Sequence, residues 1–299
     1  MALIEVTKLH KRYGDHVAVD DVSFSVAEGE IFGVLGPNGA GKTTTVECLS
    51  GLRSPDGGTI RIAGFDPLTE RREIRRILGV QLQSSELPEK IKVWEALELF
   101  ASFYGERPGD LLDRVGLTAK REAYFGKLSG GQKQRLSIAL ALVGRPRVAI
   151  LDELTTGLDP AARRETWDLI REVRDSGVTI VLVTHFMEEA ERLCDRLAVI
   201  DAGRVVAVDS PVGLIDRVNG EQRLRFRPSG PFDESVLRGL PEVTGLARDG
   251  AQIAVTGTGN LPHAVTLALA SAGIVPTDLR IEQATLDDAF LALTGKKLA

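Results

Sequence analysis

The stretch Gly36-Pro37-Asn38-Gly39-Ala40-Gly41-Lys42-Thr43-Thr44 decides the fold of this chain. It follows the apolar run 31–35 and precedes a helical pattern at 45–49, which predicts a strand, a tight turn and a helix. Glycines let backbone N–H groups approach an anion, and the start of a helix adds the positive end of its dipole. The stretch therefore predicts a phosphate-binding loop, in which Lys42 contacts the β- and γ-phosphates and Thr43 ligates Mg²⁺. The alternative is an ordinary strand-to-helix turn.

Length and composition limit the class of protein. The 299 residues are enough for about two domains, and 43% hydrophobic with 26% charged residues is typical of a soluble globular protein. A net charge of −5 argues against a nucleic-acid-binding protein. We find no apolar run of about 18 residues and no secretory signal, so we expect a cytoplasmic protein. Cys48 and Cys194 are interpreted as buried reduced thiols.

Apolar periodicity predicts the α/β class for residues 1–219. Strands expected at 3–6 and 22–26 form an antiparallel β subdomain before the glycine loop, and the continuous apolar runs 147–151 and 178–184 are typical of a parallel sheet. Residues 88–127 carry two helical stripes and predict an inserted helical subdomain. A hairpin at 196–208 closes this domain.

Residues 220–299 predict a second, smaller domain. The expected order is strand, helix, strand, strand, helix, strand, with a final helix at 286–294, which indicates a ferredoxin-like α+β fold. No motif in this part carries chemistry. It is interpreted as a regulatory or dimer-contacting domain, or as a cap that stabilises the edge of the main sheet.

Charged side chains follow two of the expected buried strands. Asp152 and Glu153 end the run 147–151, and His185 comes directly after the run 178–184. Because the carboxyl ends of parallel strands share one edge of a sheet, where ligands bind, these residues are candidates for holding a metal ion and a water molecule.

Two further positions have alternative interpretations. Leu128-Ser129-Gly130-Gly131-Gln132 opens an expected helix and is either an anion-binding turn or a simple N-terminal cap. Tyr13 stands before the turn at Gly14 and either stacks on a purine or caps a strand end; position alone favours capping.

Taken in order, the glycine loop, Gln83, Leu128–Gln132, Val148–Glu153, Gly157-Leu158-Asp159 and His185 resemble the motifs of the ATP-binding subunit of ATP-binding cassette (ABC) transporters. The resemblance covers residues 3 to about 219 and implies a P-loop NTPase core. The tail at 287–295 is similar to the tails of drug-exporter-type subunits.

The resemblance implies ATP and Mg²⁺ as ligands, with a role for each site residue. Tyr13 would stack on adenine, and Glu153 would activate the water that attacks the γ-phosphate, which His185 contacts. Asp152 would position Mg²⁺ through water, while Gln83 would ligate Mg²⁺ or the attacking water. The residues expected around the phosphates are Gly36, Asn38, Gly39, Ala40, Gly41, Lys42, Thr43 and Thr44.

The resemblance also implies partners. Ser129, Gly130, Gly131 and Gln132 would close on the nucleotide of a second subunit, identical or homologous, with Asp159 at the shared seam. A separate membrane-spanning permease would hold this pair at the inner face of the cell membrane for export, and no nucleic acid is expected. The transported substrate stays open. Leu154 departs from the proline usual at this position, which puts the local loop geometry in doubt.

Two other functions remain to be distinguished. A soluble ABC ATPase acting on nucleic acid or ribosomes is disfavoured, because the helical block 88–127 is too short for the coiled-coil insertion of such proteins. A nucleotide-binding module without hydrolysis is disfavoured by Glu153 and His185, and an ATPase assay separates it from the transporter subunit.

Overall fold

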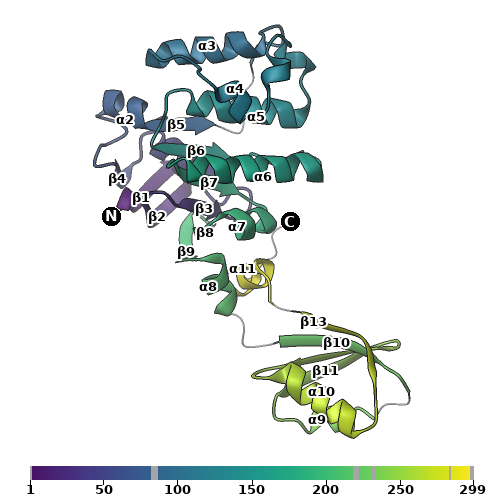
Figure 1. The fold of residues 1–299 in the computed structure, drawn as a ribbon. Coiled ribbons are helices and arrows are strands. Elements are labelled where there is room, and N and C mark those ends of the chain that lie inside the picture. Colours follow the sequence, from purple (N-terminus) through teal and green to yellow (C-terminus); the bar gives the residue numbers. More distant parts are fainter. Residues whose placement is uncertain (1, 82–86, 218–221, 231–232, 283, 297–299) are drawn as a thin grey trace. The chain divides into compact units, whose positions relative to one another are not determined.

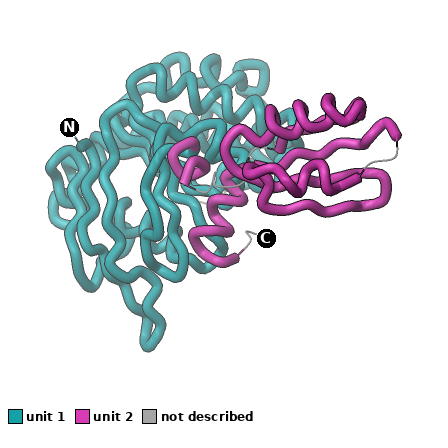
Figure 2. Tube along the Cα trace, turned by 90° about the horizontal axis from the view of Figure 1, so that it is seen from below, with its two compact units in different colours: residues 1–211, 298–299 teal, residues 212–297 magenta. Residues whose placement is uncertain are grey.

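A computed structural model describes residues 2–81, 87–217, 222–230, 233–282 and 284–296. The chain forms two compact units, Met1–Pro211 and Val212–Lys297, with the last two residues grouped with the first (Figure 2). The division falls earlier than the expected 219/220, because most of helix α8 (Pro211–Asp216) groups with the second unit. No helix within the described ranges is long and apolar enough to cross a bilayer.

A six-stranded sheet forms the centre of the first unit (Figure 1). Its order is β5-β6-β7-β3-β8-β9, with β9 alone running antiparallel to its neighbour. All residues of β3, β6 and β7 are buried, as expected for parallel strands covered on both faces. The strands are β3 (Ile31–Leu35), β5 (Leu78–Gln81), β6 (Val148–Asp152), β7 (Thr179–Thr184), β8 (Arg196–Asp201) and β9 (Arg204–Asp209).

The predicted antiparallel β subdomain is confirmed. Strands β1 (Ala2–Tyr13), β2 (His16–Ala27) and β4 (Gly57–Ile62) form a sheet of order β2-β1-β4. Alternate residues of β1, such as Ile4 and Val6, are buried in one hydrophobic core with Phe32 of β3 and Val46 of α1 (Lys42–Leu49). The subdomain is therefore fixed to the strand that precedes the glycine loop.

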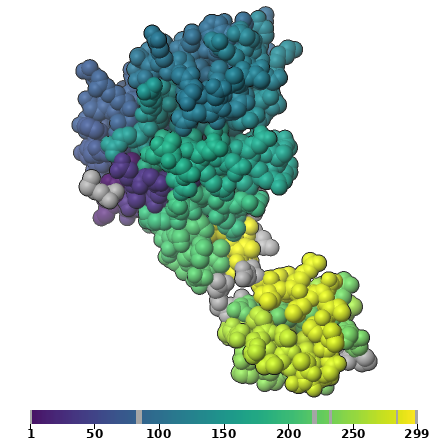
Figure 3. Space-filling view, viewed as in Figure 1, coloured from purple at the N-terminus to yellow at the C-terminus, as the bar shows by residue number. Residues whose placement is uncertain are grey.

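The helical region is less regular than the sequence suggests. Helix α2 (Arg71–Ile77) precedes β5, and α3 (Val93–Tyr104) packs against α5 (Gly130–Leu142), so the block 88–127 lies at one end of the first unit (Figures 1 and 3). The second apolar stripe forms only the single turn α4 (Leu111–Arg114), because the chain turns at Gly116 with φ of 64°. Short 3₁₀ turns follow at Thr118–Lys120 and Phe125–Lys127.

A helix follows each of the two strands that carry the acidic pair and the histidine. These helices are α6 (Pro160–Asp175), which follows β6, and α7 (Met187–Leu193), which follows β7. Cys48 and Cys194 are both buried free thiols, as predicted, and burial raises the pKa of each.

The second unit has the predicted ferredoxin-like topology. Its sheet has the order β11-β12-β10-β13 with every pair antiparallel. Its core joins Leu224, Phe226, Ile253 and Val255 of the strands to apolar residues of the helices at Ser235–Arg238 and Leu261–Ser271. The elements are β10 (Gln222–Pro228), α9 (Ser235–Arg238), β11 (Val243–Asp249), β12 (Gln252–Gly257), α10 (Leu261–Ser271), β13 (Pro276–Glu282) and α11 (Leu286–Thr294).

Candidate active site

The glycine loop connects β3 to α1 as predicted. A Cβ atom at Gly36 would lie 2.2 Å from the carbonyl oxygen of Ile200, and one at Gly41 would lie 2.3 Å from that of Ala18. Gly41 also has φ of 97° and is the N-cap of α1. Only glycine fits these two positions, so the loop lies close against the backbones of β8 and β2.

The side chain of Lys42 is directed back toward the start of this loop. Its Nζ donates hydrogen bonds to the carbonyl oxygens of Gly36 at 2.7 Å and Pro37 at 3.0 Å. Burial lowers the pKa of Lys42, while the negative charges of Glu153 and Asp152 oppose this shift. The Ala40 N–H donates to the same Pro37 carbonyl, which closes the turn. The ammonium group is therefore held inside the loop, facing the acidic pair.

A cavity of about 420 Å³ lies over the loop. It brings together eight predicted residues from three separate parts of the chain: Tyr13, Asn38, Gly39, Gly41, Lys42, Thr43, Thr44 and Glu153. His16 and Ala18 of β2 also line it and were not predicted, because no motif marks them and only the pairing of β2 with β1 places them beside Tyr13. The cavity therefore brings the glycine loop, the ring of Tyr13 and the carboxylate of Glu153 together.

Tyr13 forms one wall of this cavity and is 39% exposed. The Arg53 guanidinium carbon lies 5.1 Å from its ring centroid and Lys11 Nζ lies 5.6 Å away. An exposed ring on the cavity wall suits stacking on a nucleobase better than capping a strand end.

The acidic pair and the histidine meet at the carboxyl edge of the sheet, since β6 and β7 are parallel neighbours and β7 adjoins β3. His185 Nδ1 lies 3.2 Å from Glu153 Oε1. Glu153 has φ of 49°, a left-handed backbone conformation that is uncommon for non-glycine residues. The predicted juxtaposition of these two side chains is therefore present.

Asp152 is 1% exposed, and neither of its carboxylate oxygens has a hydrogen-bond partner among the described residues. Burial, with a smaller contribution from Glu153, raises the pKa of Asp152 to about 6, and Lys42 acts in the opposite direction. The described residues contain no cluster of three or more His, Cys, Asp or Glu that could hold a metal alone. Asp152 with Thr43 instead fits Mg²⁺, which usually keeps waters and shares its ligands with substrate phosphates.

Ser129 and Asp159 do not line this cavity. Ser129 is the N-cap of α5, where its Oγ accepts from the Gln132 N–H at 3.3 Å and the Gln132 side chain accepts from the Ser129 N–H. Asp159 caps α6 by accepting from the N–H groups of Ala162 and Ala161, and these bonds hold the pKa of Asp159 below its ordinary value. Ser129 and Asp159, at the starts of these two helices, are both exposed. Gln83 lies outside the described residues.

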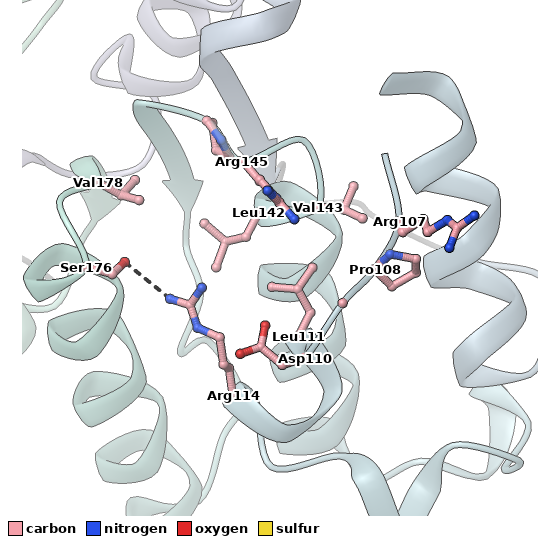
Figure 4. A pocket seen from close by; sticks show the side chains of 12 residues that line it. Arg107, Pro108, Asp110, Leu111, Arg114, Leu142, Val143, Arg145, Ser176 and Val178 are labelled. Atoms are coloured by element: carbon pink, nitrogen blue, oxygen red, sulfur yellow. Dashed lines mark hydrogen bonds between the residues drawn. The ribbon is translucent and has the colours of Figure 1, made fainter. Parts of the chain in front are cut away.

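A second cavity of about 260 Å³ contains none of the predicted site residues (Figure 4). It lies near the amino ends of β6 and β7, between α4 and the last turns of α5 and α6. Arg107, Arg114 and Arg145 line it, and Arg114 Nη2 donates to Ser176 Oγ at 3.2 Å. Asp152, Glu153 and His185 lie at the opposite ends of these strands, and Glu153 lines the first cavity, which is therefore the candidate active site.

The chain is similar to known proteins over nearly its whole length. Residues 19–156 match the family described as ABC transporter. The chain is 40% identical to the Nod factor export ATP-binding protein I of Paraburkholderia xenovorans (strain LB400), over 99% of this chain and 98% of the relative. It is 38% identical to the daunorubicin resistance ATP-binding protein DrrA3 of Streptomyces coeruleorubidus, over 98% of this chain and 96% of that one. A solved ATP-binding subunit of an ABC transporter has a TM-score of 0.64 and 31% identity, over 72% of this chain and 93% of that structure.

Proposed function

The chain belongs to the ABC transporter family, and we propose that it is the ATP-hydrolysing motor subunit of an exporter. The observation that carries the proposal is the meeting of the glycine loop, Glu153 and His185 at one sheet edge in a chain so similar to export subunits. As an ABC ATP-binding subunit, it couples ATP hydrolysis to transport.

The residues of the first cavity, together with His185 beside Glu153, divide the work of phosphoryl transfer. Tyr13 stacks on adenine, the loop N–H groups hold the phosphates, and Lys42 neutralises charge on them after leaving the loop carbonyls. Glu153 orients and activates the attacking water, while His185 contacts the γ-phosphate. Phosphoryl transfer needs positioning and charge neutralisation more than covalent chemistry, which suits this set of groups.

Thr43 and Asp152 are the residues that would hold Mg²⁺. The metal supplies positive charge to the β- and γ-phosphate oxygens when it is bound. The two unpartnered carboxylate oxygens of Asp152 support this assignment, because an ionised buried carboxylate needs a positive or hydrogen-bonding partner.

A second subunit completes the site in our proposal. Ser129, Gly130 and Gly131 are at an exposed helix start outside the cavity of their own chain, as the family's use of this turn across a dimer requires. Asp159 would lie at the seam. The proposed assembly is thus a homodimer, or a pair with a homologous subunit, that closes on two ATP molecules.

The cargo and the membrane partner complete the proposal. One relative is named for export of Nod factor and the other for resistance to daunorubicin, so we propose drugs or other small hydrophobic compounds as cargo. A separate permease subunit would carry it, with this chain on the inner face of the membrane. The alternative, an ATPase that acts on nucleic acid or ribosomes, has no support from these relatives.

Two measurements test the function. The purified chain should hydrolyse ATP in the presence of Mg²⁺, and it should recover a membrane-spanning partner when affinity-purified from detergent-solubilised membranes. A chain with no ATPase activity that also recovers no membrane protein would contradict the proposal.

A further inference from the structure

Glu189 is a buried acid that the proposed mechanism does not use. It lies on α7, four residues after His185, with 0% of its surface exposed. Its Oε1 accepts two hydrogen bonds, from Thr155 Oγ1 at 2.9 Å and from Trp167 Nε1 at 3.0 Å. Within the described ranges, its Oε2 has no hydrogen-bond partner and no basic side chain pairs with it.

Such a carboxylate is costly for packing alone. Burying a charge without an ion pair is unfavourable, and an apolar side chain of similar volume would often fill the space at least as well. We therefore look for the role of Glu189 in the two side chains that it holds by hydrogen bonds, Thr155 and Trp167.

Those two groups belong to the segments that follow Glu153 in the chain. Thr155 stands two residues after Glu153, and Trp167 is on α6, the helix that Asp159 caps. Helices α6 and α7 pack against each other (Figure 1), and the Arg163 guanidinium carbon lies 5.0 Å from the Phe186 ring centroid as a second contact between the two segments.

We propose that Glu189 is the positioning residue that keeps Glu153 and His185 within 3.2 Å of each other. Glu189 connects the chain just after Glu153 to the helix just after His185. It therefore fixes the positions of both residues at once. The inference rests on the proposed ATPase function. A displacement of about 1 Å in reacting groups can lower turnover about a hundredfold. The two side chains that Glu189 holds do not line the cavity over the glycine loop, so ATP affinity should not depend on it.

The test compares three variants on the full chain. Glu189→Leu removes both accepted hydrogen bonds and should lower kcat by about tenfold or more, with KM for ATP within about twofold of wild type. Glu189→Gln retains an oxygen that can accept both bonds and should keep kcat within about threefold of wild type. Glu188→Gln, at the exposed neighbouring position, is the matched control and should leave both constants unchanged.

A spectroscopic signal reports the same contact. The chain has two tryptophans, Trp94 and Trp167, so in a Trp94→Phe background the fluorescence reports Trp167 alone. Loss of the indole hydrogen bond in Glu189→Leu should shift this emission, whereas Glu189→Gln should not. If Glu189→Leu does not fold, Thr155→Val removes one donor only and should lower kcat by about threefold or more at constant KM.

The outcomes separate the inference from the proposed function. A wild-type chain without ATPase activity overturns the proposed function and the inference with it. An active wild type with a folded Glu189→Leu variant of equal kcat overturns the inference alone. A rise in KM without a fall in kcat, or an equal loss in the Leu and Gln variants, also overturns it.

Discussion

Glu153 combines an unusual backbone with a close partner. Its φ is 49° and its carboxylate lies 3.2 Å from the Nδ1 of His185. Glu153→Gln keeps the size of the side chain but removes its ability to take a proton. We expect ATP hydrolysis to fall by about a hundredfold or more while ATP still binds, so that closed dimers accumulate. Steady-state ATPase rates, ATP titration and sedimentation with ATP measure these effects.

The control for this variant is Glu98→Gln, which removes a charge from an exposed position on α3. It should hydrolyse ATP at the wild-type rate. Wild-type turnover in Glu153→Gln itself would show that another group activates the water.

Asp152 should make stability depend on pH. Its pKa is raised from 3.8 to about 6 in the folded chain, so between these values the folded state holds a proton that the unfolded state has lost. This group therefore makes the folded chain less stable as pH rises through that window. We expect Asp152→Asn without nucleotide to raise Tm at pH 8 by about 2–4 °C, and by less at pH 5.

Calorimetry of both proteins at the two pH values measures this difference. Hydrolysis in the presence of Mg²⁺ should be lost in the same variant, because the proposed metal ligand is gone. A Tm below that of wild type at pH 8 would show that Asp152 is not an unpaired buried charge.

At the scale of elements, Asp159 decides where α6 begins. It accepts hydrogen bonds from the first free N–H groups of the helix, at 2.9 and 3.0 Å, and Pro160 follows at the first helical position. Asp159→Ala should cost about 1 kcal/mol and lower Tm by about 2–4 °C. Asp159→Asn can still accept these bonds and should stay near wild type. Thermal unfolding of the three proteins compares them, and equal losses in both variants would assign the effect to charge and not to capping.

For the whole molecule, the proposed dimer predicts complementation between two inactive variants. Lys42→Ala removes the phosphate-loop cation, and Ser129→Arg blocks the turn that would close on the partner's nucleotide. A mixed dimer has one site with both defects and one with neither. An equimolar mixture should recover roughly a quarter of the wild-type ATPase rate, because half of randomly formed dimers are mixed and each has one intact site.

Each variant measured alone is the control and should be inactive. A mixture that stays inactive, although mixed dimers are detected, would contradict a site shared between subunits.

The sequence by itself determined the buried strands and the local motifs. Apolar runs and glycine positions placed β3, β6, β7 and the loop at Gly36, because a buried parallel strand and a tight anion-binding turn each leave a local pattern. The same holds for the order of elements in the second unit, where alternation and turn residues are also local.

Only the tertiary structure decided how distant residues meet. Strand pairing carries His16 and Ala18 to the cavity beside Tyr13, and the packing of α6 against α7 buries Glu189 between Thr155 and Trp167. Glu189 is 34 positions from Thr155 and 22 from Trp167, so no local periodicity or motif encodes these contacts.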